Sequence, residues 1–230
     1  QTVTQSGREF MKIQVADLKQ PVLFVVDMIN GFAKQGALAD PAISDAAPNI
    51  RRLIQSLNAP AWFVADEHDW NAREFDAFPP HCLKNTEESD IIDELADCVE
   101  HRIPKNSTNT FFAPDFQVFL QEQGSQYHDW VITGCCTDIC VLQFALALKA
   151  FFNQTEQDRR VIVPADCTAT YHMDEIHDGP FWQKTALDLM EAAGVLVVDA
   201  IVDTDPEKIP AAGSQESKKN SETEDTGEGN

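Results

Sequence analysis

Short apolar runs rich in Val, Ile and Phe recur along the chain and alternate with segments of helical period. The runs lack the polar alternation of half-exposed strands, which indicates strands covered by helices on both sides. The predicted strands lie near residues 21–27, 61–66, 100–103, 129–135, 159–164 and 195–200. The predicted helices lie near residues 45–56, 89–97, 115–123, 138–152 and 180–193. This order predicts an α/β fold, a doubly wound and mostly parallel sheet of about six strands with helices on both faces.

One domain, residues 16–204, is expected to hold this fold. Residues 1–15 are expected to form a disordered extension, and residues 205–230 an acidic disordered tail, because apolar periodicity is lost there. Within the domain, the connections 28–44 and 67–88 are long, and both begin at the carboxyl end of a predicted strand. Open parallel sheets bind ligands outside those ends, so both connections are candidates for a site.

The formal net charge of the chain is -21. So acidic a surface repels phosphate backbones and anionic lipid, which argues against nucleic-acid and membrane partners and favours small molecules. No apolar stretch has the length of a signal-peptide core or of a membrane span. Six cysteines in 230 residues are too sparse for a disulfide-dense secreted domain and indicate free thiols in a reducing compartment. We therefore expect a soluble, cytoplasmic protein.

Three polar side chains stand at or just beyond the ends of apolar runs: Asp27, Lys105 and Cys140. An acid, an amine and a thiol form one catalytic centre if their strands are neighbours, because an activated nucleophile needs a base and a cation nearby. Cys140 is placed at the first turn of a helix, where free N–H groups and the helix dipole are expected to lower the thiol pKa. The sequence therefore indicates a cysteine hydrolase, with an inert buried cysteine as the alternative.

Cys136 is a second candidate nucleophile, four residues before Cys140. A redox role for Cys135 and Cys136 is the less favoured alternative, because adjacent cysteines form a disulfide only with strain. The spacing from Cys136 to Cys140 also differs from the Cys-x-x-Cys redox motif. The residues alone leave the choice between the two thiols open.

A second group of polar residues follows the predicted strand 61–66: Asp66, His68, Glu74 and His81. Two imidazoles and two carboxylates can bind Zn²⁺, Mn²⁺ or Fe²⁺. The alternative is an acidic surface loop with incidental histidines. The later pair His172 and His177 is interpreted as part of a polar loop, because its five-residue spacing does not align two ligands on one helix face.

Around Asp27, Lys105 and the sequence Thr137-Asp138-x-Cys140-Val141, the chain resembles the isochorismatase-like cysteine hydrolases, and among them the nicotinamidases. The similarity covers about residues 20–202. It implies an Asp–Lys–Cys triad on a doubly wound sheet, and it selects Cys140 as the nucleophile.

The same resemblance implies a cis peptide bond between Cys135 and Cys136. That bond would direct the backbone N–H groups of Cys136 and Cys140 into an oxyanion hole. Members of the family commonly assemble as dimers or tetramers, so the resemblance also implies a homo-oligomer.

The resemblance extends to the polar group after the second strand. Nicotinamidases have an Asp-x-His sequence there and a later Pro-Pro-His, which correspond here to Asp66, His68 and His81. Glu74 corresponds to a fourth position that is His or Glu in different members. The resemblance thus implies one divalent metal ion, most simply zinc, with manganese or iron as alternatives.

An aromatic pocket is also implied, with Phe32, Leu38 and Phe78 in contact with the substrate. Flat apolar walls of this kind suit a planar ring. Phe78 replaces the Trp of some relatives, and residues 106–112 lack the Tyr that several relatives carry near this point. One wall of the pocket is therefore not defined by the sequence.

The leading hypothesis is a metal-assisted cysteine amidohydrolase that converts nicotinamide to nicotinate and ammonia through a thioester on Cys140. A related amidase of the same fold, acting on another small amide or carbamoyl substrate, is the nearest alternative. A non-catalytic binding protein with a metal ion or a reactive thiol is the alternative from a different class.

Overall fold

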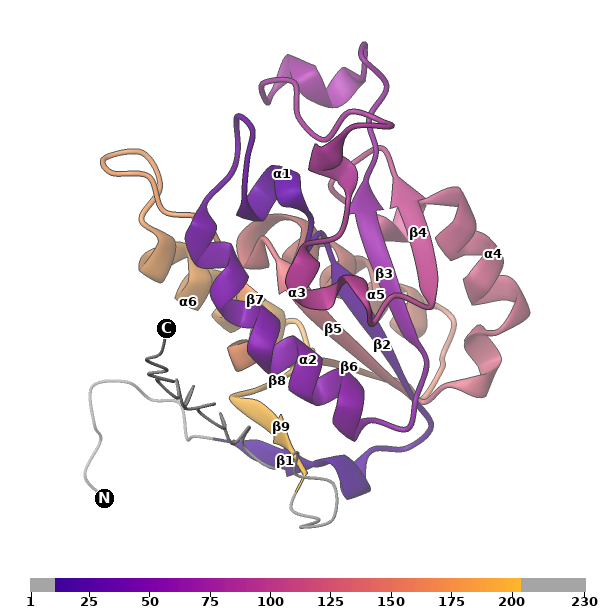
Figure 1. Ribbon diagram of the computed structural model, residues 1–230. Coiled ribbons are helices and arrows are strands. Elements are labelled where there is room, and N and C mark those ends of the chain that lie inside the picture. Colours follow the sequence, from indigo (N-terminus) through magenta and orange to yellow (C-terminus); the bar gives the residue numbers. More distant parts are fainter. Residues whose placement is uncertain (1–10, 204–230) are drawn as a thin grey trace, which may run out of the picture.

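A computed structural model describes residues 11–203 (Figure 1). Its seven-stranded sheet has the main order β4-β3-β2-β5-β6-β8, every neighbouring pair is parallel, and β7 pairs with the end of β5. The strands are β2 (Pro21–Val26), β3 (Ala61–Asp66), β4 (His101–Lys105), β5 (Asp129–Cys135), β6 (Arg160–Pro164), β7 (Thr168–Ala169) and β8 (Leu196–Val198). The chain builds outward from β2 to β4 and then returns to the other side of β2. The predicted doubly wound α/β fold is confirmed, and its switch point lies between β2 and β5.

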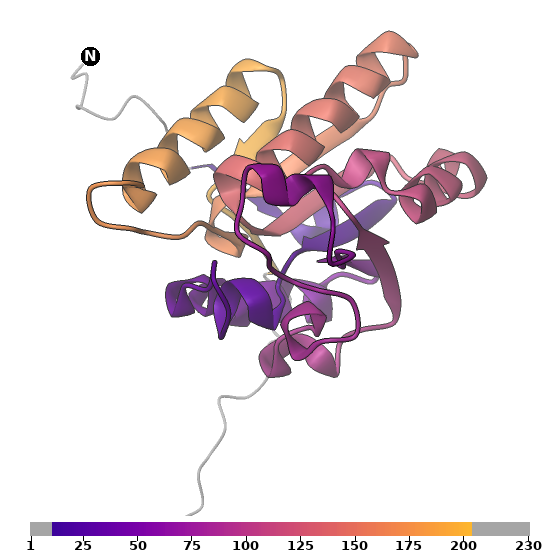
Figure 2. The same cartoon turned by 90° about the horizontal axis from the view of Figure 1, so that it is seen from above.

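Helices cover both faces of the sheet, which Figure 2 shows from the carboxyl ends of the strands. Helix α2 packs on one face, and α4, α5 and α6 pack on the other. The helices are α1 (Asn30–Ala33), α2 (Ala47–Ser56), α3 (Asp93–Ala96), α4 (Pro114–Glu122), α5 (Leu142–Gln154) and α6 (Gly179–Ala192). Short 3-10 turns occupy Val15–Asp17, Pro41–Ala46, Arg73–Asp76, Glu87–Ser89, Thr110–Phe112, Gly124–Gln126 and Ala165–Cys167, and a π-helical turn occupies Thr137–Val141. No helix of the part described is long and apolar enough to cross a membrane.

Side chains of the central strand β2 enter two separate cores. Leu23 and Val25 join the core beneath α2, whereas Val22, Phe24 and Val26 join the core beneath α4, α5 and α6. All five are almost completely buried. Because both faces are covered, both sets of alternating residues are apolar, which explains the absence of polar alternation in the sequence.

Phe24 lies at the centre of an aromatic cluster in the second core. The rings of Phe116, Phe119, Trp130 and Phe144 surround it, with centroid distances of 5.4–5.8 Å. Three of these pairs meet edge to face, an arrangement that aromatic quadrupoles favour. The cluster joins β2 and β5 to α4 and α5.

We expect Phe24→Ala to lower the free energy of unfolding by about 3–5 kcal/mol, because the cavity left behind is enclosed by four large rings that cannot close it. Urea unfolding followed by circular dichroism measures this change. Phe112→Ala is the matched control, since the Phe112 side chain is 70% exposed and its loss should change stability by less than about 1 kcal/mol. Equal unfolding free energies for the two variants would contradict the prediction.

Both ends of the described chain meet in a small second sheet. Strand β1 (Lys12–Gln14) runs parallel to β9 (Ala200–Val202), and Ile13 packs against the core beneath α2. Residues 12–14 were expected to belong to a disordered extension, and the structure differs there because β9 supplies their backbone partners. The single strand predicted at 195–200 is correspondingly divided into β8 and β9. The expected acidic tail 205–230 lies outside the described residues.

Two predicted helices have different bounds in the structure. The segment 89–97 contains only a 3-10 turn and the short helix α3. The helix predicted at 138–152 starts with the π-helical turn and continues as α5 to Gln154. That π-helical turn holds Cys140, so the difference falls at the candidate nucleophile.

Candidate active site

The carboxyl ends of β2, β4 and β5 bring the predicted acid, amine and thiol together. Asp27 directly follows β2, Lys105 ends β4, and Cys140 lies in the turn after β5. The Lys105 ammonium is 2.8 Å from the Asp27 carboxylate and 3.8 Å from the Cys140 sulfur. All three residues are at least 95% buried. A thiol, a proton acceptor and a cation therefore share one enclosed space.

Asp66 joins this group as a fourth member. It ends β3, the strand between β2 and β4, and one of its carboxylate oxygens accepts a hydrogen bond from the Lys105 ammonium. Its backbone N–H donates to the Asp27 carboxylate at 3.0 Å. The single positive charge of Lys105 is thus shared by two buried carboxylates, whereas the sequence placed Asp66 in the metal cluster alone.

Burial and charge pairing oppose each other in setting the proton affinities of this group. It raises the pKa of Asp27 to about 7, with a further increase from the charge of Asp66 and an opposing decrease from Lys105. Burial favours the neutral amine of Lys105, but the Asp27 and Asp66 charges outweigh it and raise the Lys105 pKa well above its usual range. Lys105 is therefore a permanent cation, and Asp27 is suited to exchange a proton near neutral pH.

The direction expected for the Cys140 pKa was wrong. Burial raises the pKa of this thiol well above its usual range, and the opposing effect of the Lys105 charge is smaller. The effect of the turn's N–H groups does not prevail, because a thiolate in this closed site would lose its solvation. Cys140 therefore rests as a thiol, and an adjacent base must remove its proton before it can attack.

The local backbone orients the acid and the nucleophile turn. Asp27 has a φ of +52°, an uncommon conformation for a residue with a side chain, and it follows directly on a buried strand. Gly134 has a φ of +105°, and a side chain there would lie 1.9 Å from the carbonyl oxygen of Val26. Only glycine allows β5 to approach β2 this closely. The peptide bond between Cys135 and Cys136 is cis, as the resemblance implied.

The structure also distinguishes the two candidate thiols. Cys136 lines the same cavity as Cys140. The Cys140 sulfur contacts Lys105 and lies within 4.8 Å of carboxylate oxygens of Asp27 and Asp66. Cys140 is thus the thiol that the base and the cation can reach.

The four predicted metal ligands form a second cluster beside this group. Ligand atoms of Asp66, His68, Glu74 and His81 all lie within 4.8 Å of one another. The distances from each histidine Nε2 to the nearest Asp66 and Glu74 oxygens are 3.6–3.9 Å, beyond hydrogen-bond range. The sequence analysis predicted these four residues, and the fold brings them together.

Neighbouring groups orient the histidines and the glutamate. His68 Nδ1 is 2.9 Å from the Asn106 side-chain oxygen, and His81 Nδ1 is 2.8 Å from the Pro79 carbonyl. These acceptors leave Nε2 of both rings without a proton in the neutral form. The backbone N–H of Thr108 donates to the Glu74 carboxylate at 2.9 Å. The Nε2 lone pairs of the two histidines and the carboxylates of Asp66 and Glu74 are therefore directed at one point.

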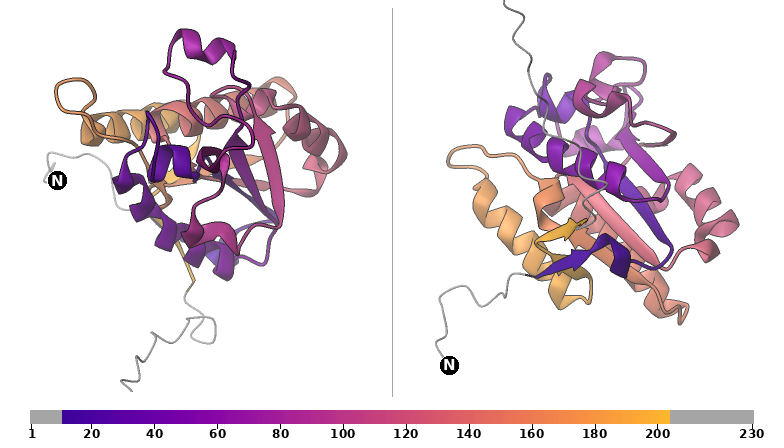
Figure 3. Two further views of the ribbon diagram at one scale, coloured as in Figure 1. Left: turned by 45° about the horizontal axis from the view of Figure 1, so that its top comes forward. Right: turned by 60° about the horizontal axis from the view of Figure 1, so that its bottom comes forward.

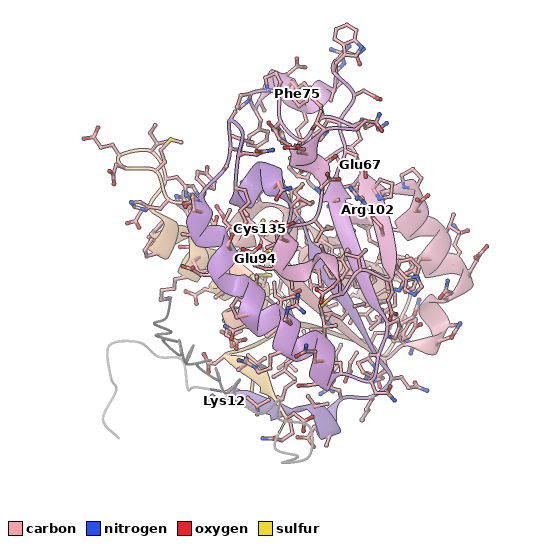
Figure 4. All side chains as sticks on the ribbon, in the orientation of Figure 1. Lys12, Glu67, Phe75, Glu94, Arg102 and Cys135 are labelled. Atoms are coloured by element: carbon pink, nitrogen blue, oxygen red, sulfur yellow. The ribbon has the colours of Figure 1, made fainter. Side chains whose placement is uncertain are left out.

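The loop that carries these ligands rises from the end of β3. Figure 4 shows Phe75 on this loop, where its ring packs 5.3 Å from that of His68 and 5.6 Å from that of His81. Figure 4 also shows Glu67 beside Arg102 at the start of the loop, where an ion pair of 2.7 Å attaches it to β4. The packing of Phe75 and the ion pair between Glu67 and Arg102 thus hold this loop in place.

The cluster has the properties of a divalent cation site. Asp66 Oδ2 and His68 Nε2 are buried and have no hydrogen-bond partner, although such atoms are nearly always paired in folded proteins. Two carboxylates and two imidazole lone pairs directed at one point repel each other unless a cation lies between them. Nitrogen and oxygen ligands in this number suit zinc, manganese or iron.

We expect Asn106→Ala to weaken metal binding about 10- to 100-fold, because His68 would lose the acceptor that fixes its orientation. Competition with a chromophoric chelator measures the metal dissociation constant directly. Asn71→Ala is the matched control, since Asn71 is an exposed amide on the ligand loop. Equal dissociation constants for the two variants would contradict a role for Asn106.

A cavity of about 150 Å³ opens onto both clusters. Cys140 lies in its wall together with three of the four metal ligands, Asp66, Glu74 and His81. The three predicted substrate contacts, Phe32, Leu38 and Phe78, also line it. Among the described residues that line the cavity there is no lysine or arginine. The space is therefore apolar and aromatic, with acidic and histidine groups at the metal cluster.

Residues that the sequence analysis did not identify form another wall. They belong to the segment between β7 and α6 and include Tyr171, His172, Met173 and Ile176. Asp40 and Thr108 were also missed as lining residues. A polar sequence around 172–178 gave no signal that this segment turns its apolar side chains to the cavity.

Known proteins share both the sequence pattern and the fold. Residues 21–202 match the model of the isochorismatase domain. Over 153 residues the chain is 31% identical to nicotinamidase 1 of Arabidopsis thaliana, a match that covers 56% of this chain and 60% of that protein. Nicotinamidase PncA from Bacillus subtilis has a similar structure, with a TM-score of 0.64 and 24% identity over 78% of this chain and 99% of that chain. N-carbamoylsarcosine amidase from Thermoplasma acidophilum has a TM-score of 0.63 and 25% identity over 78% and 96% of the respective chains.

These comparisons differ in what they establish. The matched region spans less than two thirds of the Arabidopsis protein. The similarity to the Bacillus structure shows a shared fold. The isochorismatase model, in contrast, matches nearly the whole of the described structure. This chain therefore belongs to the isochorismatase family.

Proposed function

We propose that this protein is a metal-assisted cysteine amidohydrolase whose substrate is nicotinamide, which it converts to nicotinate and ammonia. The observation that carries the proposal is the position of Cys140, which contacts Lys105 of the Asp27–Lys105 pair and lines one cavity with three of the metal ligands. Relatives named as nicotinamidases support it.

The first half of the reaction transfers the acyl group to sulfur. Asp27 accepts the Cys140 thiol proton, and the sulfur attacks the carboxamide carbon. Lys105 stabilises the thiolate, and the backbone N–H groups of Cys136 and Cys140 receive the oxyanion. Asp27 then returns the proton to the departing nitrogen, the C–N bond breaks, and ammonia leaves a thioester on Cys140.

The second half regenerates the enzyme with water. Asp27 accepts a proton from a water molecule, and the oxygen attacks the thioester carbon. The C–S bond breaks, the acid is released, and the sulfur recovers its proton from Asp27. The near-neutral pKa of Asp27 suits a group that acts as base and acid in turn.

Asp66, His68, Glu74 and His81 would hold the divalent cation, which supplies a Lewis acid for a ring nitrogen of the substrate. The apolar walls then hold the planar ring and exclude water. Phe32, Leu38 and Phe78 serve this purpose in the proposal, together with Tyr171.

A neutral aromatic amide fits this cavity better than a carboxylate-bearing substrate. Apart from the metal site, the charged groups in its wall are acidic, and no described lysine or arginine lines it. Outside the metal site, a substrate carboxylate would meet Asp40 and would find no lysine or arginine to pair with among the described lining residues, which is costly in an enclosed site. This favours nicotinamide over a carbamoyl amino acid such as N-carbamoylsarcosine.

Ammonia release tests the proposal directly. The protein is stripped of metal with a chelator, reloaded with zinc, manganese or iron, and supplied with nicotinamide or N-carbamoylsarcosine. We expect ammonia from nicotinamide with reloaded protein only. Release from N-carbamoylsarcosine alone would favour the alternative amidase, and release from neither would favour a binding protein. Cytoplasmic location and homo-oligomer assembly stay predictions from the sequence.

A further inference from the structure

His177 has no part in the proposed reaction, yet it is 93% buried within a segment that sequence analysis treated as a polar loop. Its Nε2 is 2.7 Å from the Asp138 carboxylate, and its Nδ1 is 2.8 Å from the Tyr171 carbonyl. Both ring nitrogens therefore lie at hydrogen-bond distance from an acceptor. These two contacts fix the orientation of the His177 ring between Tyr171 and Asp138.

Two aromatic rings lie nearly parallel to the His177 ring. The Tyr171 ring stacks on His177 with centroids 3.8 Å apart and planes 14° apart, and the Trp182 ring lies at 5.8 Å and 13°. Stacked rings bury apolar area and restrict one another's orientation. The ring of Tyr171, which lines the cavity, is thus held in place by its contact with His177.

Asp138 connects this arrangement to the nucleophile. It lies in the π-helical turn, two residues before Cys140. Its second carboxylate oxygen accepts a hydrogen bond from the Thr170 hydroxyl. The Asp138 carboxylate therefore contacts Thr170 and His177, the two ends of segment 170–177.

The segment between these attachments has few other supports. It lies between β7 and α6 and projects from the body of the molecule (Figures 1 and 3). It is at the same end of the sheet as the loop after β3 that carries the predicted metal ligands. Ile176 is 75% exposed and Met173 is 46% exposed, although both line the cavity. Another tie to the body is the hydrogen bond of 2.8 Å from the His172 N–H to Asp40. Asp138, which contacts both Thr170 and His177, is therefore a main attachment of the segment to the body of the molecule.

We propose that the contact between His177 and Asp138 is a clasp that positions the Tyr171–Ile176 wall against the nucleophile turn. His177 is then a positioning residue for substrate binding, and it never contacts the reacting atoms. The effect expected on KM rests on the proposed nicotinamidase function, whereas the effect expected on hydrogen exchange in the segment does not.

Steady-state kinetics with nicotinamide test the kinetic consequence. We expect His177→Ala to raise KM about tenfold with kcat changed less than twofold, because a charge-assisted hydrogen bond that shapes the binding wall is lost. His177→Gln retains one donor and should show a smaller rise. In a double-mutant cycle, Asp138→Asn should add little to His177→Ala if the two residues act as one unit. A fall in kcat with KM unchanged would overturn the proposal.

Hydrogen exchange measured by mass spectrometry tests the clasp without reference to any substrate. We expect exchange in residues 171–178 to become about tenfold faster in His177→Ala and to stay unchanged in β2 and β5. Asp174→Asn is the matched control, since Asp174 is an exposed carboxylate on the same segment that pairs only with His172 among the described contacts. It should leave exchange in 171–178 unchanged.

The two tests separate failure of the clasp from failure of the proposed function. If the wild type releases no ammonia from nicotinamide, the proposed function fails, and the exchange measurement alone decides on the clasp. Unchanged exchange in both His177→Ala and His177→Gln would overturn it. Should His177→Ala fail to fold, His177→Gln provides the same comparison.

Discussion

Cys140→Ala is expected to lower amide hydrolysis by about 10⁴-fold or more, because the sulfur that forms the covalent intermediate is removed. The Cys140 sulfur contacts the Lys105 ammonium and lies within 4.8 Å of an Asp27 carboxylate oxygen. Cys136 is the alternative thiol. Ammonia release measures the loss. Intact-protein mass after brief reaction with substrate should show an acyl adduct on the wild type and none on the variant.

Two further variants make this result specific to the nucleophile. Cys98→Ser changes a thiol that lies beside Asp97 and does not line the cavity. This variant should retain full activity. Cys136→Ala keeps the backbone N–H proposed for the oxyanion hole, so it should lower activity less than about tenfold. A Cys140→Ala protein that still releases ammonia at the wild-type rate would refute the proposed mechanism. An acyl adduct on Cys136 would show that the wrong thiol was chosen.

Lys105→Met is expected to lower the free energy of unfolding by about 3–5 kcal/mol, besides abolishing activity, because it leaves two buried carboxylates without their cation. Asp27 and Asp66 both contact the Lys105 ammonium, and all three side chains are fully or almost fully buried. Chemical unfolding of metal-free protein measures the effect without a contribution from bound metal.

Asp27→Asn provides the contrasting case. It leaves the Lys105–Asp66 pair intact, so stability should change much less, while activity should fall about 10²- to 10⁴-fold through loss of the base. Lys184→Met is the surface control, since its pairing with Asp188 is exposed and should contribute less than about 1 kcal/mol. Equal destabilisation by Lys105→Met and Lys184→Met would show that Lys105 does not neutralise the two carboxylates.

Much of the site could be predicted because its residues stand at recognisable places in the sequence. Asp27, Lys105 and Cys140 follow or end apolar strands, and a parallel sheet directs all such ends to one edge. The four metal ligands lie at the end of β3 or in the single loop that follows it, so their chemistry is visible at short range. The strands themselves followed from residue types that tolerate burial on both faces.

Other parts of the site depend on contacts between distant segments. The second partner of Lys105 is Asp66, which ends the neighbouring strand 39 residues earlier. Asn106 and His68 meet across the same two strands, and no short-range pattern relates them. The wall formed around Tyr171 was missed because a polar sequence does not reveal which side chains turn inward.

The sequence by itself determined the strand–helix order, the chemical groups available at the strand ends and the family to which the chain belongs, since these follow from residue type and spacing. Only the tertiary structure decided the strand neighbours, the contact between His177 and Asp138 and the raised pKa of Cys140. The physical reason is that desolvation and charge pairing act through space. Whether they raise or lower the pKa of a given residue depends on segments that lie far away along the chain.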